Sequence, residues 1–332
     1  MSKTEYANFE LKPSNSCAVK VCSLDPLIIF TSRLYNTGMK EALFTKDIPV
    51  DGVIPVWQPI GWSTNEIARQ VGMKHGVKTS HTGTLDPMAE GVIIVLSGET
   101  RNKKYEYANW PKEYEFEVIF GISTDTYDGM GLVEKNEITS FCAKFFKNFA
   151  TVNKFTKTEL ENFAKNLDQK LASFVGLYEQ IVPSYSSVKF MGKPLHYHVR
   201  GLSNIETKQK MQSNLPKKEG QIFSLKNTKI YTIKLNEAKK FLLKKIKKVE
   251  GDFRQVEIMD FWKSFMKEDD KEFALVVGQF HTVMTKGLYV RSLALDIAKS
   301  LGTVGFVSNL IRIRNGDYTK KDCFSLENIL NL

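Results

Sequence analysis

Apolar and polar positions follow strand-like patterns in three stretches of the sequence. Residues 92–96 read Val-Ile-Ile-Val-Leu, and an apolar run of this length, bounded by polar residues, is typical of a buried strand. Residues 112–120 alternate polar and apolar side chains with a period of two, as a half-buried strand does. Residues 54–57 make a third strand-like stretch. These stretches predict a β-sheet that packs against a core.

Three other stretches have the apolar spacing of helices. Ser63 and Glu66 have the pattern of a capping box, and Ile67 and Val71 then fall on one helical face. A second capping box is predicted at residues 158–161. The stripe of that second helix comprises Leu160, Phe163, Leu167, Leu171 and Phe174. The third helix is indicated by Leu293, Ile297 and Leu301, with Gly302 as its C-terminal cap.

The segment 81–91 surrounds one carboxylate with glycines and a proline. Gly83 and Gly91 can adopt backbone angles that other residues avoid, while Pro87 fixes its own φ and keeps Asp86 out of the helical region. An isolated Asp-Pro between glycines is most often an Asx turn in a hairpin. Here a buried strand follows at once, so the pattern predicts a loop at the edge of the core that fixes the direction of the Asp86 carboxylate.

Composition narrows the class of protein. The 332 residues allow one large domain with appendages or two domains. A net charge of +10 and a pI near 9.2 favour a polyanionic partner, nucleic acid first. The four cysteines have neither CxxC nor zinc-finger spacing, and no apolar run approaches the roughly 18 residues that span a bilayer. The N-terminus lacks a signal-peptide pattern, so we expect a cytoplasmic protein without a membrane segment or structural metal.

Lysines are concentrated between residues 202 and 275, which have the appearance of an insertion. Residues 238–249 predict an amphipathic helix with Phe241, Leu242, Leu243 and Ile246 on one side. Its lysines are candidates for phosphate contacts. That this lysine face is only exposed to solvent, and binds nothing, is an equally favoured alternative. The candidates are Lys239, Lys240, Lys244, Lys245, Lys247 and Lys248, together with Lys189 outside this region. Residues 1–50 contain one strand-like stretch, 27–30, and their role is not assigned.

The loop around Asp86 resembles the catalytic loop of the TruB family of tRNA pseudouridine synthases, whose usual form is GHTGxLDPxAxGxLxxxxGxxTK. The agreement continues in segments that resemble other family motifs. These segments are residues 58–63, 112–114, 121–131, 182–189 ending in Lys189, 192–201, 279–293 and 310–318. The sequence departs from the pattern at Ser80, where the family has glycine, and at Gln58, where it has lysine. If that lysine supports the catalytic loop, Gln58 must do so differently.

The resemblance covers about residues 54–329 and implies an α/β (α+β) pseudouridine synthase fold: a mixed, largely antiparallel sheet flanked by helices. It implies an N-terminal extension (1–50) and a catalytic domain (51–332) with a basic insertion (about 202–275). Many family members continue into an RNA-binding PUA domain, which we do not expect in this chain. The implied reaction breaks the bond between the ribose and N1 of uracil and rejoins the base to the ribose through C5, without a cofactor.

By resemblance, the catalytic residues are Asp86, its charge partner Arg291 and the base-stacking Tyr114. Without the resemblance, Tyr114 would count as a core residue. His81, Tyr289 and Leu310 are the remaining expected substrate contacts, with His81 assisting base flipping. The resemblance leaves open whether the carboxylate attacks C1′, attacks C6 or acts as a base on the sugar.

The expected partner is the T-stem-loop of tRNA, with uridine 55 as the family default, bound by a monomer without a guide RNA. Two alternatives stay open: a non-catalytic tRNA-binding chaperone and a guide-RNA-dependent synthase of the dyskerin type. His196 and His198, at alternate positions of an expected strand, could suggest a metal site, but no cysteine or acidic partner accompanies them. We therefore predict no metal.

Overall fold

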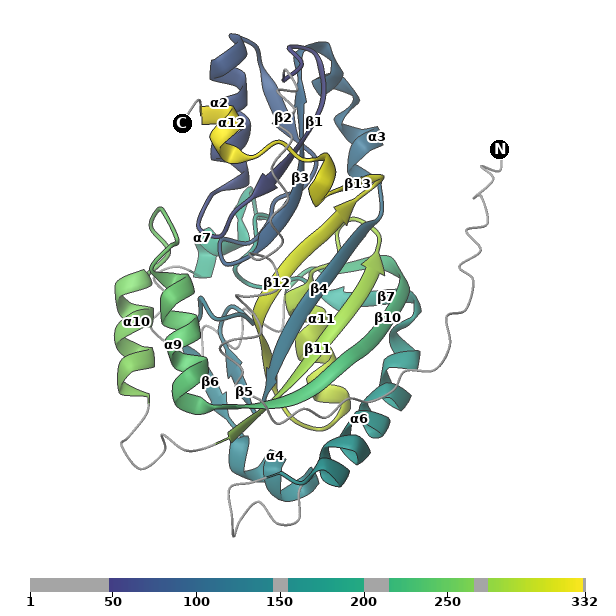
Figure 1. Ribbon diagram of the computed structural model, residues 1–332, viewed down its shortest axis with the longest axis vertical. Helices are drawn as coiled ribbons and strands as arrows, with labels where there is room; N and C mark the ends of the chain where they lie inside the picture. The colour runs from purple at the N-terminus through teal and green to yellow at the C-terminus, as the bar shows by residue number, and fades with distance from the viewer. Residues whose placement is uncertain (1–47, 146–154, 200–214, 266–273, 331–332) are drawn as a thin grey trace, which may run out of the picture.

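The computed structural model describes residues 48–145, 155–199, 215–265 and 274–330 of the chain. The strand expected at residues 27–30 lies outside these ranges, as does nearly all of the expected N-terminal extension. The described residues form a large twisted sheet with helices against it (Figure 1).

The main sheet contains nine strands in the described residues, in the order β1-β3-β12-β4-β11-β10-β7, with β2 paired to β3 and β13 to β12. Every pairing is antiparallel except that of β3 with β12. The strands are β1 (Gly52–Gln58), β2 (Thr79–His81), β3 (Glu90–Ser97), β4 (Lys112–Phe120), β7 (Gly176–Ile181), β10 (Lys217–Lys234), β11 (Ala274–Met284), β12 (Gly305–Asn315) and β13 (Tyr318–Thr319). The expected mixed, largely antiparallel sheet is confirmed.

Strand β3 shows why its sequence is so apolar. Residues 91–97 are all buried, and β3 lies between β1 and β12 in the sheet. A Cβ atom at Gly91, which has a φ of 137°, would collide with the backbone of Arg312. The glycine therefore lets β12 approach at the point where the loop around Asp86 enters the sheet.

Within the described ranges, four short strands pair outside the main sheet. They are β5 (Ile122–Thr124) with β6 (Val133–Asn136), and β8 (Lys189–Phe190) with β9 (Lys193–Pro194).

The helices of the described ranges pack against the sheet and its ends (Figure 1). They are α2 (Thr64–His75), α3 (Lys104–Ala108), α4 (Ile138–Phe145), α6 (Lys157–Leu171), α7 (Leu195–Val199), α9 (Leu235–Ile246), α10 (Gln255–Ser264), α11 (Val290–Ser300) and α12 (Leu326–Leu330). The predicted stripes of α2 and α11 are buried, and so is that of α6 as far as Leu171. Phe174, the last residue predicted for the α6 stripe, lies beyond the helix and is only partly buried. Gly302, with a φ of 72°, follows the end of α11 as expected.

Two predicted capping boxes were wrong in detail. Ser63 is the N-cap of α2, but its side chain makes no capping hydrogen bond. Glu66 instead accepts hydrogen bonds from Arg69 and Gln70 within its own helix. The box of α6 lies two residues earlier than predicted, at Thr156 and Glu159. Two Ser/Thr-x-x-Glu frames overlap here, at Thr156–Glu159 and Thr158–Glu161, and the structure uses the first.

The lysine-rich region is only partly an insertion. Residues 217–234 form β10, which pairs with both β11 and β7 in the main sheet. The region then leaves the sheet as α9 and α10, which lie side by side at one edge of the molecule (Figure 1). Part of the region expected to be an insertion is therefore a strand of the main sheet, and the helical pair α9–α10 lies outside that sheet.

No helix within the described ranges is long and apolar enough to cross a membrane. Those ranges also contain no group of three or more His, Cys, Asp or Glu side chains placed to hold a metal ion. His196 and His198 lie on the short helix α7 and not on a strand, and their rings contact the backbone oxygens of Ser186 and Phe190.

Candidate active site

Asp86 lies in the loop between β2 and β3. Leu85 and Met88 on either side are buried in the core, and the amide of Ala89 donates to the Asp86 carbonyl across a tight turn, at 2.9 Å. The two apolar anchors and the turn fix the backbone around the carboxylate. The side chain of Asp86 remains 28% exposed, so the loop presents an accessible carboxylate from a rigid base.

The guanidinium of Arg291 holds this carboxylate in a bidentate arrangement. Its Nε donates to Oδ2 of Asp86 and its Nη2 to Oδ1, both at 2.9 Å. The remaining N–H groups donate to the carbonyls of Thr126 at 2.8 Å and Tyr185 at 3.1 Å. Arg291 is the second residue of α11 and is only 4% exposed. The Arg291 guanidinium thus has hydrogen-bond acceptors on both sides, and it orients the Asp86 carboxylate.

A second carboxylate, Asp128, lies close to the same guanidinium, 3.7 Å from its Nε. It accepts hydrogen bonds from the Thr126 hydroxyl at 2.6 Å and the Met130 amide at 2.9 Å. Burial raises the pKa of Asp128 to about 6, although Arg291 acts in the opposite direction. Burial alone would lower the pKa of Arg291, but Asp86 and Asp128 raise it. The guanidinium is therefore always charged in this site.

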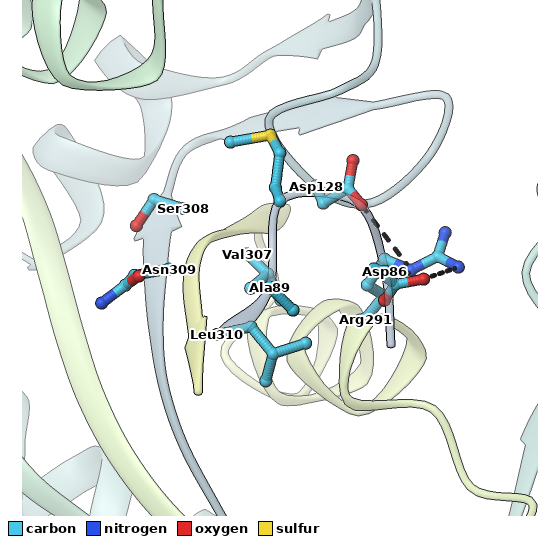
Figure 2. A pocket seen from close by; sticks show the side chains of 9 residues that line it. Asp86, Ala89, Asp128, Arg291, Val307, Ser308, Asn309 and Leu310 are labelled. Atoms are coloured by element: carbon cyan, nitrogen blue, oxygen red, sulfur yellow. Dashed lines mark hydrogen bonds and ion pairs between the residues drawn. The ribbon is translucent and has the colours of Figure 1, made fainter. Parts of the chain in front are cut away.

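These charged groups line one side of a pocket (Figure 2). Its lining consists of Asp86, Met88, Ala89, Asp128, Arg291, Val307, Ser308, Asn309 and Leu310. The apolar side chains of Val307 and Leu310 lie beside the ion pair in Figure 2. The Asp86 carboxylate and the Leu310 side chain therefore line the same small pocket.

Gln58, which stands where the family has lysine, supports the loop through Thr64. The fully buried Gln58 side chain donates to the Trp62 carbonyl at 2.9 Å and accepts from the Thr64 hydroxyl at 2.6 Å. The same hydroxyl accepts from the Leu85 amide at 3.0 Å, one residue before Asp86. A neutral relay from β1 through α2 therefore anchors the catalytic loop.

The loop is also held on its other side. The amide of Gly61 donates to the Pro87 carbonyl at 2.9 Å. Gly61 has a φ of 100°, and a Cβ there would collide with the backbone of Lys248, so glycine is needed at this position. Asp86 therefore sits between two backbone anchors, at Leu85 and at Pro87.

The other expected substrate contacts, Tyr114, Tyr289 and His81, are not in the pocket lining. Tyr114 is 8% exposed on β4, opposite Thr282 and Arg312. Tyr289 immediately precedes α11, and its backbone is bound from both sides by the Gln180 amide group. Burial raises the pKa of Tyr289, which Arg291 opposes and Asp86 reinforces, as expected for a ring close to the pair.

His81 ends β2, and its Nε2 contacts Oδ1 of Asn65 at 2.7 Å. Burial lowers the pKa of His81 to about 4, with further contributions from the positive charges of Lys104 and Arg312. The imidazole is therefore neutral at pH 7. Of the predicted site residues, the structure brings Asp86, Arg291 and Leu310 together in one pocket, with His81 and Tyr289 on the flanking elements.

The candidate phosphate-binding lysines divide into two groups. Lys240, Lys244, Lys247 and Lys248 are exposed, as is Lys189 on β8, and Lys239 is half-buried with its ammonium on the Lys263 carbonyl. Lys245 is 5% exposed, and its Nζ donates to Oδ1 of Asn309 at 2.6 Å. Lys245 therefore points into the protein beneath the pocket and not toward a phosphate, which corrects its expected placement.

Several residues of the site were missed in the sequence. Asp125 and Asp128 lie in a segment, 121–131, that the pattern identified as a hydrogen-bonded turn, and the turn is observed. Nothing in the sequence of that segment indicated that it lies close to Arg291. Arg254, whose guanidinium binds both oxygens of Asp125, lies in the insertion, where no motif marks it.

Comparisons with known proteins identify the family of the chain. The model of the TruB family pseudouridylate synthase N-terminal domain matches residues 69–231. A tRNA pseudouridine synthase B of Staphylococcus aureus strain MSSA476 is 30% identical over 284 residues, covering 85% of this chain and 72% of that protein. The enzyme of the same name from Halalkalibacterium halodurans is 29% identical over 276 residues, covering 82% of this chain and 69% of that protein.

Among solved structures, a chain in the crystal structure of a Cbf5-Nop10-Gar1 complex is similar over 85% of this chain and 54% of its own length. Its TM-score is 0.47 and its sequence identity 15%. This chain therefore spans about half the length of that protein.

The fold and the site present a fixed, accessible carboxylate at the edge of a small pocket, an arrangement suited to acid–base or nucleophilic catalysis. The chain belongs to the TruB family of pseudouridylate synthases. It is thus an RNA pseudouridine synthase, an isomerase, as the sequence resemblance implied.

Proposed function

We propose that this enzyme converts a uridine of tRNA to pseudouridine and that its target is uridine 55 of the T-loop. The observation that carries the proposal is the Asp86 carboxylate, held by Arg291 through two hydrogen bonds and accessible at the edge of the pocket. The substrate class is supported by relatives that are tRNA pseudouridine synthases B by name. The T-loop position rests on the family resemblance.

The reaction moves the ribose C1′ from N1 to C5 of uracil and a hydrogen from C5 to N1. Because no electrons are gained or lost, the reaction needs no redox cofactor, and the chain's own residues supply the chemistry. Asp86 acts as an ionised carboxylate, whether as nucleophile at C1′ or C6 or as a base on the sugar. Arg291 keeps that carboxylate charged and aimed.

The target base must leave the RNA stack before it can reach Asp86. We assign its stacking surface to Tyr114, assistance in flipping to His81, and the walls of the base site to Tyr289 and Leu310. For Leu310 the assignment is supported by its place in the pocket beside Asp86. For the other three it rests on the resemblance and on their positions in flanking elements.

Affinity for the RNA backbone comes from basic side chains outside the pocket. The exposed lysines of α9 and the turn after it, together with Lys189, are assigned to phosphate contacts. We further propose that the enzyme acts as a monomer on the T-stem-loop without a guide RNA.

A T-stem-loop hairpin with tritium at C5 of a single uridine tests this function, because C5 loses its hydrogen in the reaction. We expect the wild-type enzyme to release tritium in EDTA without any second RNA. Asp86→Asn should retain less than about 1% of the single-turnover rate while binding the hairpin normally, since phosphate contacts supply most affinity. A hairpin with the label at another uridine is the matched control.

The possible outcomes separate the alternatives. A wild-type protein that binds the hairpin without converting it would be the tRNA-binding chaperone. Conversion only after addition of a second RNA would indicate the guide-dependent synthase. Turnover by Asp86→Asn near the wild-type rate would remove Asp86 from the mechanism.

A further inference from the structure

The helical pair α9–α10, which is added to the sheet, contacts the active site through Arg254. Arg254 is the N-cap residue of α10, and its side chain is 21% exposed. Its Nη1 donates to Oδ2 of Asp125 at 3.0 Å, and its Nη2 donates to Oδ2 and Oδ1 at 3.1 and 3.3 Å. The guanidinium also lies over the ring of Tyr185, 4.6 Å from its centre.

The backbone around Arg254 is arranged specifically for this contact. Arg254 has a φ of 59°, in the left-handed region that a residue with a Cβ adopts only at a cost. The neighbouring Gln255 side chain binds the carbonyls of Val249 and Gly251 and accepts from the Phe253 amide, which closes the turn. The turn thus holds Arg254 in a strained conformation that directs its side chain at Asp125.

Both residues that Arg254 contacts lead directly to Arg291. Asp125 is covalently followed by Thr126, whose carbonyl accepts from Nη1 of Arg291. The carbonyl of Tyr185 accepts from Nη2 of Arg291, and the Tyr185 hydroxyl donates to Asp125 at 3.2 Å. The Thr126 and Tyr185 carbonyls, which accept hydrogen bonds from the Arg291 guanidinium, therefore both belong to segments that Arg254 contacts.

The same added segment is attached to the site at two other points. The Lys245 ammonium donates to Oδ1 of Asn309 in the pocket lining. The Glu250 amide donates to the Gly61 carbonyl at 3.1 Å, and Gly61 binds Pro87 beside Asp86. Three contacts from one segment therefore reach the surroundings of the Asp86–Arg291 pair, at the Asp125 turn, at Asn309 in the pocket lining and at Gly61 beside the Asp86 loop. A helical pair serving only as an RNA-binding arm would not need these contacts.

We infer that Arg254 is a positioning residue for pseudouridine formation, acting through Asp125 and Tyr185 to hold Arg291 against Asp86. The inference deepens the proposed function and rests on it. Removal of Arg254 leaves the 5% exposed Asp125 carboxylate without its cation and frees the Tyr185 ring on one face. The Thr126 and Tyr185 carbonyls then lose their fixed spacing, and Arg291 aims Asp86 less well.

The test compares single-turnover conversion of the labelled hairpin by saturating wild-type enzyme, Arg254→Met, Arg254→Lys and Asp125→Asn, together with hairpin affinity at several salt concentrations. We expect Arg254→Met to react at least tenfold more slowly with an affinity within twofold of wild type and an unchanged salt dependence. Arg254→Lys should be intermediate, because it keeps the charge and loses the fork. The double variant Arg254→Met/Asp125→Asn should be no slower than the slower single variant, since the two residues act as one unit.

Arg69→Met is the matched control, because Arg69 makes a similar two-point contact with Glu66 on α2, outside the site. It should convert the hairpin at the wild-type rate. Failure of wild type and Arg69→Met to form pseudouridine would refute the proposed function and the inference with it. With wild type active, the inference alone is refuted by three results: an unchanged rate in Arg254→Met, an affinity loss with a reduced salt dependence, or additive effects in the double variant. Rates are measured at least 15 °C below the melting temperature of every variant. If Arg254→Met does not fold, wild-type rates in both Arg254→Lys and Asp125→Asn also refute the inference.

Discussion

The relay that runs from Gln58 through Thr64 to Leu85 makes a quantitative prediction for Thr64→Val. Valine has nearly the shape of threonine, so the substitution removes the hydroxyl and leaves packing intact. Thr64 and Gln58 are fully buried and Leu85 is 5% exposed. The change therefore leaves the Leu85 amide without a partner and Gln58 without its donor, in a place that water does not reach.

A buried group left without its hydrogen bond costs roughly 1–3 kcal/mol. The two groups together predict a loss of at least about 2 kcal/mol in the free energy of unfolding, measured by equilibrium urea denaturation. The single-turnover rate should fall as well, because the Leu85 amide is the anchor on one side of Asp86. Hairpin affinity should not change, since no phosphate-binding side chain is altered.

Thr64→Ser is the control for this experiment. It keeps the hydroxyl and both hydrogen bonds but loses a methyl group, which costs about 1 kcal/mol by transfer alone. Thr64→Val should be the less stable and the slower of the two. If Thr64→Val proves as stable as Thr64→Ser, the hydroxyl does not hold the loop and the relay has no energetic weight.

Three further predictions follow from the charged groups. Arg291→Lys should lower the single-turnover rate roughly 10- to 100-fold, because one ammonium cannot replace the guanidinium fork, whose charged hydrogen bonds contribute about 1.5–3 kcal/mol each. A rate within twofold of wild type would contradict this role of Arg291. Since burial lowers the pKa of His81 from 6.5 to about 4, the unfolded chain takes up this proton first as the pH falls. The histidine's contribution to stability is therefore present above pH 6.5 and lost toward pH 4, and between pH 7 and 5 urea denaturation should show a smaller loss for His81→Asn than for wild type. Replacing Lys240, Lys244 and Lys247 by glutamine should weaken hairpin binding without changing the rate at saturation. The slope of log affinity against log salt concentration should fall by about 0.9 for each duplex phosphate that these lysines neutralise. An unaltered slope would mean that this face of α9 is merely solvated.

The sequence predicted those parts of the fold that depend on neighbours along the chain. The apolar run of β3, the alternation of β4 and the stripes of α2, α6 and α11 all reflect burial of one face or both, which periodicity records directly. The capping box of α6 was displaced by two residues, because residue type alone does not separate two overlapping Ser/Thr-x-x-Glu frames. The strand β10 was hidden by its lysines, since its charged side chains can extend to solvent while its backbone pairs on both sides.

The candidate site was predictable as far as a known motif extended. Asp86 and Arg291 were found by resemblance, and the structure places their side chains in bidentate contact although 205 residues separate them. Arg254 and Lys245 could not be found in this way, because their partners lie far along the chain and nothing in their own neighbourhood distinguishes them from surface cations. Gln58 was recognisable as a departure from the motif, but its connection to Leu85 through Thr64 appears only in three dimensions.

The position of β12 in the sheet has a consequence for synthesis of the chain. This strand comprises residues 305–315, yet it lies between β3 and β4, which end nearly 200 residues earlier. Until residues 305–315 have left the ribosome, the apolar strand β3 and its distant neighbour β4 each present an unpaired edge, the kind of surface that recruits other chains. Closure of the main sheet therefore has to wait for β12, and we expect chains that stop before residue 305 to aggregate, while chains that include β12 close the sheet.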